Sequence, residues 1–100
     1  MLYAMIGEDV PASNERRAAA RPAHLVRLQE LIAAGRLILA GPFPAIDAAD
    51  PGSAGMTGSL IVAEFESIEE ANAWMHADPY VTEGVFASVT VKPFRQVFPA

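Results

Sequence analysis

The segment from Arg21 to Pro42 constrains the fold most, because its pattern predicts one helix that leads directly into a buried strand. Pro22 suits the first helical turn, where its missing N–H leaves no donor unpaired, and Gly35 suits the left-handed position that closes a helix. His24 stands at the edge of the apolar face of this helix, so we expect it where the core meets a cavity. The apolar face is formed by residues at helical spacing: Leu25, Leu28, Leu31 and Ile32.

Four apolar segments predict strands. Leu2–Ile6 is apolar at every position, as expected for a central strand that is covered on both faces. Leu37–Ala40 predicts a second buried strand, which we expect to end at Gly41 and Pro42. A third strand spans roughly residues 58–65, and a fourth runs from Val85 to about Phe98.

The sequence offers two possible starts for the first predicted helix. Ser13 or Asn14 can cap a short helical turn upstream of the main helix. Proline disfavours helical geometry at the residue before it, so Pro22 predicts a kink or restart at Arg21. We therefore expect the main helix to run from about Pro22 to Ala34.

The second predicted helix begins at a capping box, Ser67-Ile68-Glu69-Glu70. In this motif the serine oxygen accepts the Glu70 N–H, and the Glu70 side chain returns to the Ser67 N–H. Pro79 ends the helix, and a turn follows as far as Gly84. The side that faces inward contains Ile68, Ala71, Trp74 and Met75, and Asp78 follows on the same side.

The predicted order is strand, helix, strand, strand, helix, strand in a chain of 100 residues. It suits an α+β fold, namely one ferredoxin-like βαββαβ sandwich over residues 1–100, with two helices on one face of a four-stranded antiparallel sheet. Helices cover only one face of such a sheet, whereas the predicted strands are apolar on both. We therefore expect a homodimer that forms through the uncovered face.

Charge and composition exclude several classes of partner. The net charge of −5 argues against a surface for nucleic acid or for an anionic membrane, either of which needs clustered Lys and Arg. No apolar run approaches the length of a membrane span, and Met1–Ile6 is too short for a signal peptide, so we expect a cytoplasmic protein. The chain has no cysteine, which excludes thiolate metal sites and cysteine nucleophiles.

Two histidines, His24 and His76, are the side chains that titrate near neutral pH without perturbation. We expect Asp78 to pair with His24, because a buried carboxylate needs a partner and a carboxylate that orients a histidine is a minimal unit for acid and base catalysis. The alternative is that Asp78 only caps the turn before Pro79 and that His24 is a core residue. His76 is expected on the surface.

Candidate substrate-binding residues lie near the same place. Arg16, Arg17 and Arg21 precede the main helix, where they can meet an anionic substrate near His24 or pair with acidic surface groups instead. Ser59 begins the third strand and can donate a hydrogen bond into the pocket. We take Arg17, Arg21 and Ser59 as the candidates.

A metal site is not expected. Asp47 and Asp50 lie in the surface loop that proline, glycine and aspartate residues predict between the second and third strands. They lack the spacing of a calcium-binding loop.

Short motifs distributed along the whole chain resemble those of the YciI family. The matching motifs are Arg21-Pro22-Ala23-His24-Leu25, Gly35-Arg36-Leu37, Ala40-Gly41-Pro42, Gly58-Ser59, Glu69-Glu70-Ala71 with Trp74, Asp78-Pro79-Tyr80 and Val91-Lys92-Pro93-Phe94. The resemblance implies a ferredoxin-like subunit that dimerises, akin to the dimeric α+β barrel superfamily of muconolactone isomerases. It also implies a pocket with a paired histidine and aspartate, which correspond to His24 and Asp78.

The resemblance implies a chemistry but no specific substrate. Many YciI-like proteins have no assigned activity, and one related branch removes chloride from chlorinated hydroxyhydroquinones with this histidine and aspartate. The first hypothesis is therefore a cofactor-independent lyase or isomerase, or a dehydrochlorinase-like enzyme, that acts on a small oxygenated ring compound through His24 and Asp78. The alternative is a non-catalytic dimer that binds a small molecule. A more distant option is haem binding with His24 as axial ligand.

Overall fold

The structure, a computed structural model, describes residues 1–100 and follows the predicted order of α-helices and strands with one addition. The added element is the short helix α3, which replaces the turn that we expected after Pro79. The elements are β1 (Leu2–Asp9), α1 (Asn14–Ala33), β2 (Leu37–Pro44), the 3-10 turn η1 (Gly52–Ala54), β3 (Met56–Glu64), α2 (Ile68–His76), α3 (Pro79–Thr82) and β4 (Phe86–Phe94).

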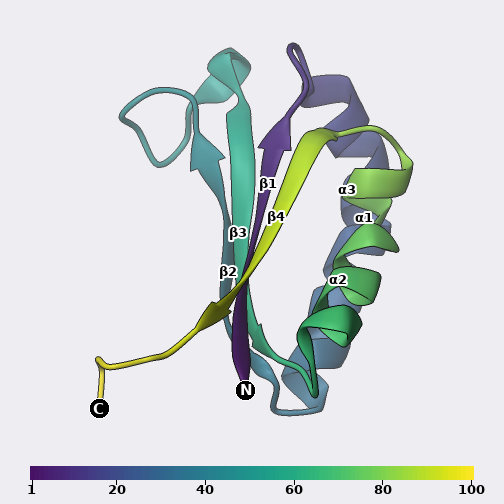
Figure 1. Ribbon diagram of the computed structural model, residues 1–100. Coiled ribbons are helices and arrows are strands. Elements are labelled where there is room, and N and C mark those ends of the chain that lie inside the picture. Colours follow the sequence, from purple (N-terminus) through teal and green to yellow (C-terminus); the bar gives the residue numbers. More distant parts are fainter.

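The strands form one antiparallel sheet of four strands in the order β2-β3-β1-β4. Figure 1 shows the helices together on one face of this sheet, while the other face carries no element of the chain. The predicted α+β ferredoxin-like arrangement is therefore confirmed. β1 is a central strand, as expected, and β2 and β4 are the two edges.

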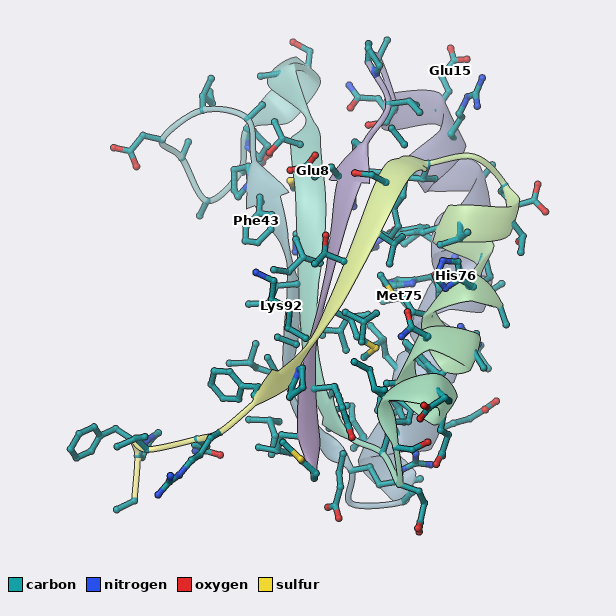
Figure 2. All side chains as sticks on the ribbon, viewed as in Figure 1. Glu8, Glu15, Phe43, Met75, His76 and Lys92 are labelled. Carbon is teal, nitrogen blue, oxygen red and sulfur yellow. The ribbon has the colours of Figure 1, made fainter.

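The core lies between the sheet and the helices. Met5 and Ile61 are almost completely buried there, as is Met75 of α2, which Figure 2 shows on the side of the helix that faces the sheet. The side chains of β1 and β3 that face the helices belong to cross-strand partners: Tyr3 with Ala63, Met5 with Ile61, and Gly7 with Ser59. This register places Ser59 on the helical face of the sheet, under α1.

The predicted restart of the helix at Pro22 is wrong, because α1 runs from Asn14 to Ala33 without interruption. A proline inside a helix removes the hydrogen bond to the carbonyl four residues earlier, here that of Ala18. Ala18 and Pro22 are both exposed, so water can satisfy this carbonyl. Ile32, which we expected on the covered face, is also exposed. The buried residues of the helix are Arg17, Ala20, His24, Leu28 and Leu31.

The second strand differs from the prediction in length and in burial. β2 continues through Gly41 and Pro42 to Pro44, because it is an edge strand, where a proline needs no ladder partner for its missing N–H. Leu39 is 50% exposed, so this strand is not buried within the single chain. Leu39 pairs with Val62, which places its side chain on the face opposite the helices.

One of the two hydrogen bonds predicted for the capping box is present. The Ser67 Oγ accepts the Glu70 N–H at 3.1 Å, as predicted. The return bond differs, since Glu70 Oε2 accepts the N–H of Glu66 at 3.0 Å rather than that of Ser67. The other Glu70 oxygen accepts from Arg36.

The sheet face that the helices leave open carries several exposed apolar side chains, including Leu39 and Phe43. Homodimerisation through this face stays a prediction. None of the helices combines the length and the apolar character needed to cross a membrane.

Candidate active site

His24 and Asp78 come together where α1 packs against α3. His24 lies in the middle of α1, and Asp78 is the N-cap residue of α3, between Ala77 at the end of α2 and Pro79. The His24 Nδ1 is 2.8 Å from the Asp78 Oδ2. Asp78 is completely buried, with an exposed fraction of 0%.

Asp78 accepts hydrogen bonds from three groups. Its Oδ2 bonds the His24 ring and the Tyr80 N–H, the latter at 2.9 Å, and its Oδ1 accepts from Arg27 Nη1, also at 2.9 Å. Burial raises the pKa of Asp78, but the hydrogen bond from His24 and the charge that this ring has when it is protonated, and then the bonds from Tyr80 and Arg27, lower the pKa below its ordinary value of 3.8. The carboxylate is therefore ionised at neutral pH.

The ionised carboxylate fixes the state of the histidine ring. Because Asp78 can only accept, the Nδ1 of His24 must carry the proton of their hydrogen bond. The Nε2 of His24 has no hydrogen-bond partner in the chain. Every buried side-chain nitrogen or oxygen has such a partner, so Nε2 is not buried but open to solvent. It is the nitrogen that can exchange a proton with a ligand.

A cavity of about 200 Å³ lies beside His24, between α1 and the β2–β3 edge of the sheet. The three predicted substrate-binding residues, Arg17, Arg21 and Ser59, all line it. Arg16 does not, since it points to the Gly84 carbonyl. No acidic side chain lines the cavity, so its polar wall is cationic in a chain whose net charge is −5.

Arg17 is held firmly at the back of this cavity. Its Nε and Nη2 donate to both oxygens of Asp9, at 2.6 and 2.8 Å, and Nη2 also donates to the Gly58 carbonyl and to Ser59 Oγ. The Arg17 guanidinium also lies over the Tyr80 ring, 5.0 Å from its centroid, and its hydrogen bond and charge act on the Tyr80 hydroxyl. Arg17 therefore places a positive charge at the wall of the cavity.

Two residues of the site were not found by sequence reasoning. Tyr80 stacks on the His24 ring, with the ring centroids 3.9 Å apart and the planes 7° from parallel. Burial raises the pKa of the Tyr80 hydroxyl above its ordinary value of 10.0, so this cavity-lining group stays neutral. Arg27 was also missed, although its position three residues after His24 on the same helix is a usable signal.

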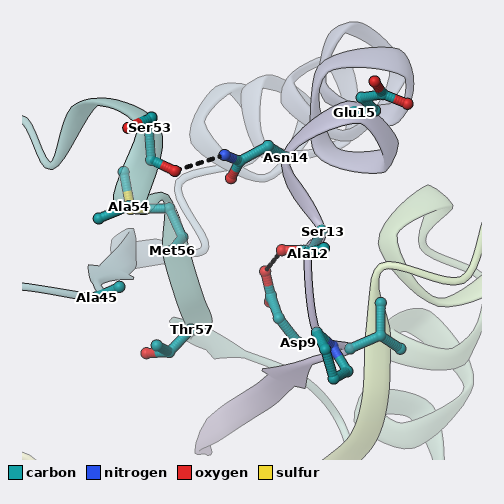
Figure 3. Close-up of a pocket in the computed structure, with 12 residues that line it drawn as sticks. Asp9, Ala12, Ser13, Asn14, Glu15, Ala45, Ser53, Ala54, Met56 and Thr57 are labelled. Carbon is teal, nitrogen blue, oxygen red and sulfur yellow. Dashed lines mark hydrogen bonds between the residues drawn. The ribbon is translucent and has the colours of Figure 1, made fainter.

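Other candidate positions are not part of this site. His76 is exposed on α2 and bonds only the Asn72 carbonyl. No group of three His, Cys, Asp or Glu residues could hold a metal ion. A larger hollow of about 710 Å³ lies between the β1–α1 turn and residues 45–57. Figure 3 shows the residues that line it, among which Asn14 donates to the Ser53 carbonyl. That hollow contains no histidine.

Comparison with known proteins identifies close relatives. "Protein YciI" of Escherichia coli O6:H1 is 57% identical over 98 residues, which cover 98% of this chain and 100% of that protein. An uncharacterized protein of Haemophilus influenzae is 49% identical over the same length, with the same coverage of both chains.

A solved structure is similar over nearly the whole fold. It is the 5-chloro-2-hydroxyhydroquinone dehydrochlorinase of Burkholderia phenoliruptrix AC1100 in complex with 2,5-dihydroxybenzoquinone. It has a TM-score of 0.83 and 29% identity, with coverage of 95% of this chain and 94% of that one. The family model for the YCII-related domain matches residues 1–95. Together with the 57% identical relative, this match shows that the chain belongs to the YCII-related (YciI-like) family.

Proposed function

We propose that this protein is a small cofactor-independent enzyme, a lyase or isomerase, in which His24 transfers protons on a small oxygenated ring compound. One observation carries the proposal: the Nδ1 of His24 is bound to a buried, ionised Asp78, while the ring lines a cavity and its Nε2 has no partner in the chain. In this arrangement the carboxylate orients the ring and stabilises the imidazolium that forms when Nε2 takes a proton.

The cavity suits a developing negative charge. When Nε2 removes a proton from a ring hydroxyl or carbon, the electron pair moves onto a ring oxygen. The positive charges of Arg17 and Arg21, which both line the cavity, would stabilise this oxyanion. Ser59 Oγ, which accepts from Arg17, would orient the ring through a further hydrogen bond. The imidazolium then returns its proton to another atom of the substrate.

The substrate is small. The cavity volume of about 200 Å³ lies below the range of roughly 300–1,000 Å³ typical of pockets for drug-sized ligands. The structurally similar dehydrochlorinase is named for a single-ring substrate and has a single-ring quinone bound. If this chain performs the same elimination, the substrate loses one proton, which Nε2 takes, and one chloride, which leaves with the electron pair of the C–Cl bond.

The test is chloride release from 5-chloro-2-hydroxyhydroquinone by the wild type and by His24→Gln. We expect the variant to lose about 10²–10⁴-fold in kcat, the usual contribution of a positioned acid or base. It should still bind 2,5-dihydroxybenzoquinone within a few-fold of the wild-type affinity. His76→Gln, which changes the exposed histidine, serves as the matched control and should keep full activity.

Two results would contradict the proposal. One is a His24→Gln variant as active as the wild type. The other is a wild type that binds oxygenated rings but converts none of them, which would favour the alternative of a non-catalytic binding protein. A Soret band on addition of haem, lost in His24→Gln, would favour haem binding. A cytoplasmic location stays a prediction from the sequence.

A further inference from the structure

Arg27 binds the side of Asp78 that His24 leaves free. Its Nη1 donates to Asp78 Oδ1 at 2.9 Å, and its Nη2 donates to the Trp74 carbonyl at 2.8 Å. The guanidinium carbon lies 4.2 Å from the centroid of the Trp74 ring, which adds a cation–π contact. These three contacts hold the guanidinium in place, and Arg27 does not line the cavity. Arg27 can therefore reach a ligand only through Asp78 and His24.

We propose that Arg27 is a positioning residue that keeps the His24 ring neutral, with its proton on Nδ1, so that Nε2 is free to accept a proton at neutral pH. The inference rests on the proposed function, because a neutral ring with an open Nε2 is what a general base requires.

The physical reason is the balance of charge around the ring. A buried carboxylate next to an imidazole favours the imidazolium over the neutral ring. A cation bound to the other oxygen of the same carboxylate offsets that attraction. The guanidinium also prevents the carboxylate from rotating, so that Oδ2 stays aligned with Nδ1.

The other charged or titratable groups near the ring are accounted for. From α1, Arg17 and Arg21 line the same cavity; the charge of Arg17 is balanced by Asp9 of β1, and Arg21 is exposed to solvent, which screens it. From α3, Tyr80 stacks on the ring and is neutral. Arg27 is the one arginine that forms an ion pair with Asp78.

Arg36 offers a matched control for a purely structural role. Like Arg27, it donates to a backbone carbonyl, that of Glu64 at 3.0 Å, and to a carboxylate, that of Glu70 at 3.1 Å. Its guanidinium carbon also lies over an aromatic ring, that of Phe65, at 4.9 Å. It contacts neither His24 nor Asp78, so its loss tests the effect of removing a comparable network elsewhere.

The experiment is an NMR pH titration of the histidine ring nitrogens in ¹⁵N-labelled protein. His76→Gln assigns the signals of the second histidine. In Arg27→Gln we expect the titration midpoint of the His24 ring to move to higher pH by about half a unit or more, because a cation is lost. Arg27→Lys, which keeps the charge, should restore most of the wild-type value, and Arg36→Gln should leave the midpoint unchanged.

Each outcome decides the inference. It is overturned if Arg27→Gln titrates like the wild type, or if Arg27→Lys shifts the midpoint as far as Arg27→Gln does. It is also overturned, without any variant, if the wild-type spectrum at neutral pH shows a protonated Nε2. Asp78→Asn separates the proposed role of Arg27 from the proposed function of the His24–Asp78 pair. If the His24 titration midpoint moves to lower pH in Asp78→Asn but does not move in Arg27→Gln, only the role of Arg27 is rejected. No shift in either variant rejects the His24–Asp78 pair itself.

Discussion

Asp78 has two roles that the sequence presented as alternatives. As N-cap of α3 it accepts the Tyr80 N–H, and with the same oxygen it accepts the Nδ1–H of His24. A carboxylate oxygen has two lone pairs, so both bonds form at once. The cap fixes the carboxylate at the end of a short helix, and this position brings it to the histidine ring.

The lowered pKa of Asp78 predicts how stability depends on pH. A carboxylate whose pKa is lowered by folding contributes stability above its ordinary value of 3.8 and loses it as pH falls through the lowered pKa. We expect Asp78→Asn to reduce the free energy of unfolding by about 2–4 kcal/mol at pH 7, because three donors lose a charged acceptor. The difference from the wild type should shrink below about pH 4.

Urea denaturation of both proteins at pH 7 and pH 3 measures this difference. Glu69→Gln, which neutralises an exposed carboxylate in the first turn of α2, is the control and should cost less than about 1 kcal/mol. A penalty for Asp78→Asn that is the same at both pH values would mean that the carboxylate contributes through shape alone.

At the level of elements, α1 shows how packing overrides a local signal. The helix continues through Pro22 because residues on both sides of the proline are buried against the rest of the chain, Arg17 and Ala20 before it and His24 and Leu28 after it. Local preference at Arg21 opposes this geometry, but a continuous helix is needed to bring Arg17 and His24 to the same cavity.

Pro22 lowers the free energy of unfolding, because its missing N–H leaves the Ala18 carbonyl without a helical hydrogen bond. Pro22→Ala restores an N–H that can bond the Ala18 carbonyl, so we expect the free energy of unfolding to rise by about 1–3 kcal/mol. Pro22→Gly restores the same donor but adds flexibility to the unfolded chain, so it should gain about 1 kcal/mol less. Thermal or urea unfolding of the three proteins ranks them, and a Pro22→Ala variant less stable than the wild type would contradict this account.

At the level of the whole molecule, the open face of the sheet exposes apolar side chains that no helix covers. The side chains of Leu39 and Phe43, 50% and 40% exposed, lie on it beside Ile6 and Val62. A self-complementary pairing of two such faces through a two-fold axis would remove this apolar surface from water. We propose a homodimer formed in this way.

The dimer is tested by measuring the molecular mass with light scattering as the protein elutes from a size-exclusion column. We expect the wild type to have twice the chain mass of 10.6 kDa and Leu39→Glu to elute as a monomer, because it would place charges within the apolar interface. Ile32→Glu introduces the same charge at a position that is 61% exposed on α1 and should stay dimeric. A wild type that is monomeric at all concentrations would reject the proposal.

The sequence by itself determined the order of the four strands and the two long helices, the start of α2 at Ser67 and the position of His24 on the inner side of α1. These features depend on periodicity and caps, which act within a few residues of the chain. Only the tertiary structure decided what surrounds that histidine. Asp78 lies 54 residues from His24 along the chain, and the hydrogen bond from Arg27 to Asp78 spans 51 residues. Such contacts arise from the packing of α1 against α3 and α2, and no local pattern records which side chains that packing brings together.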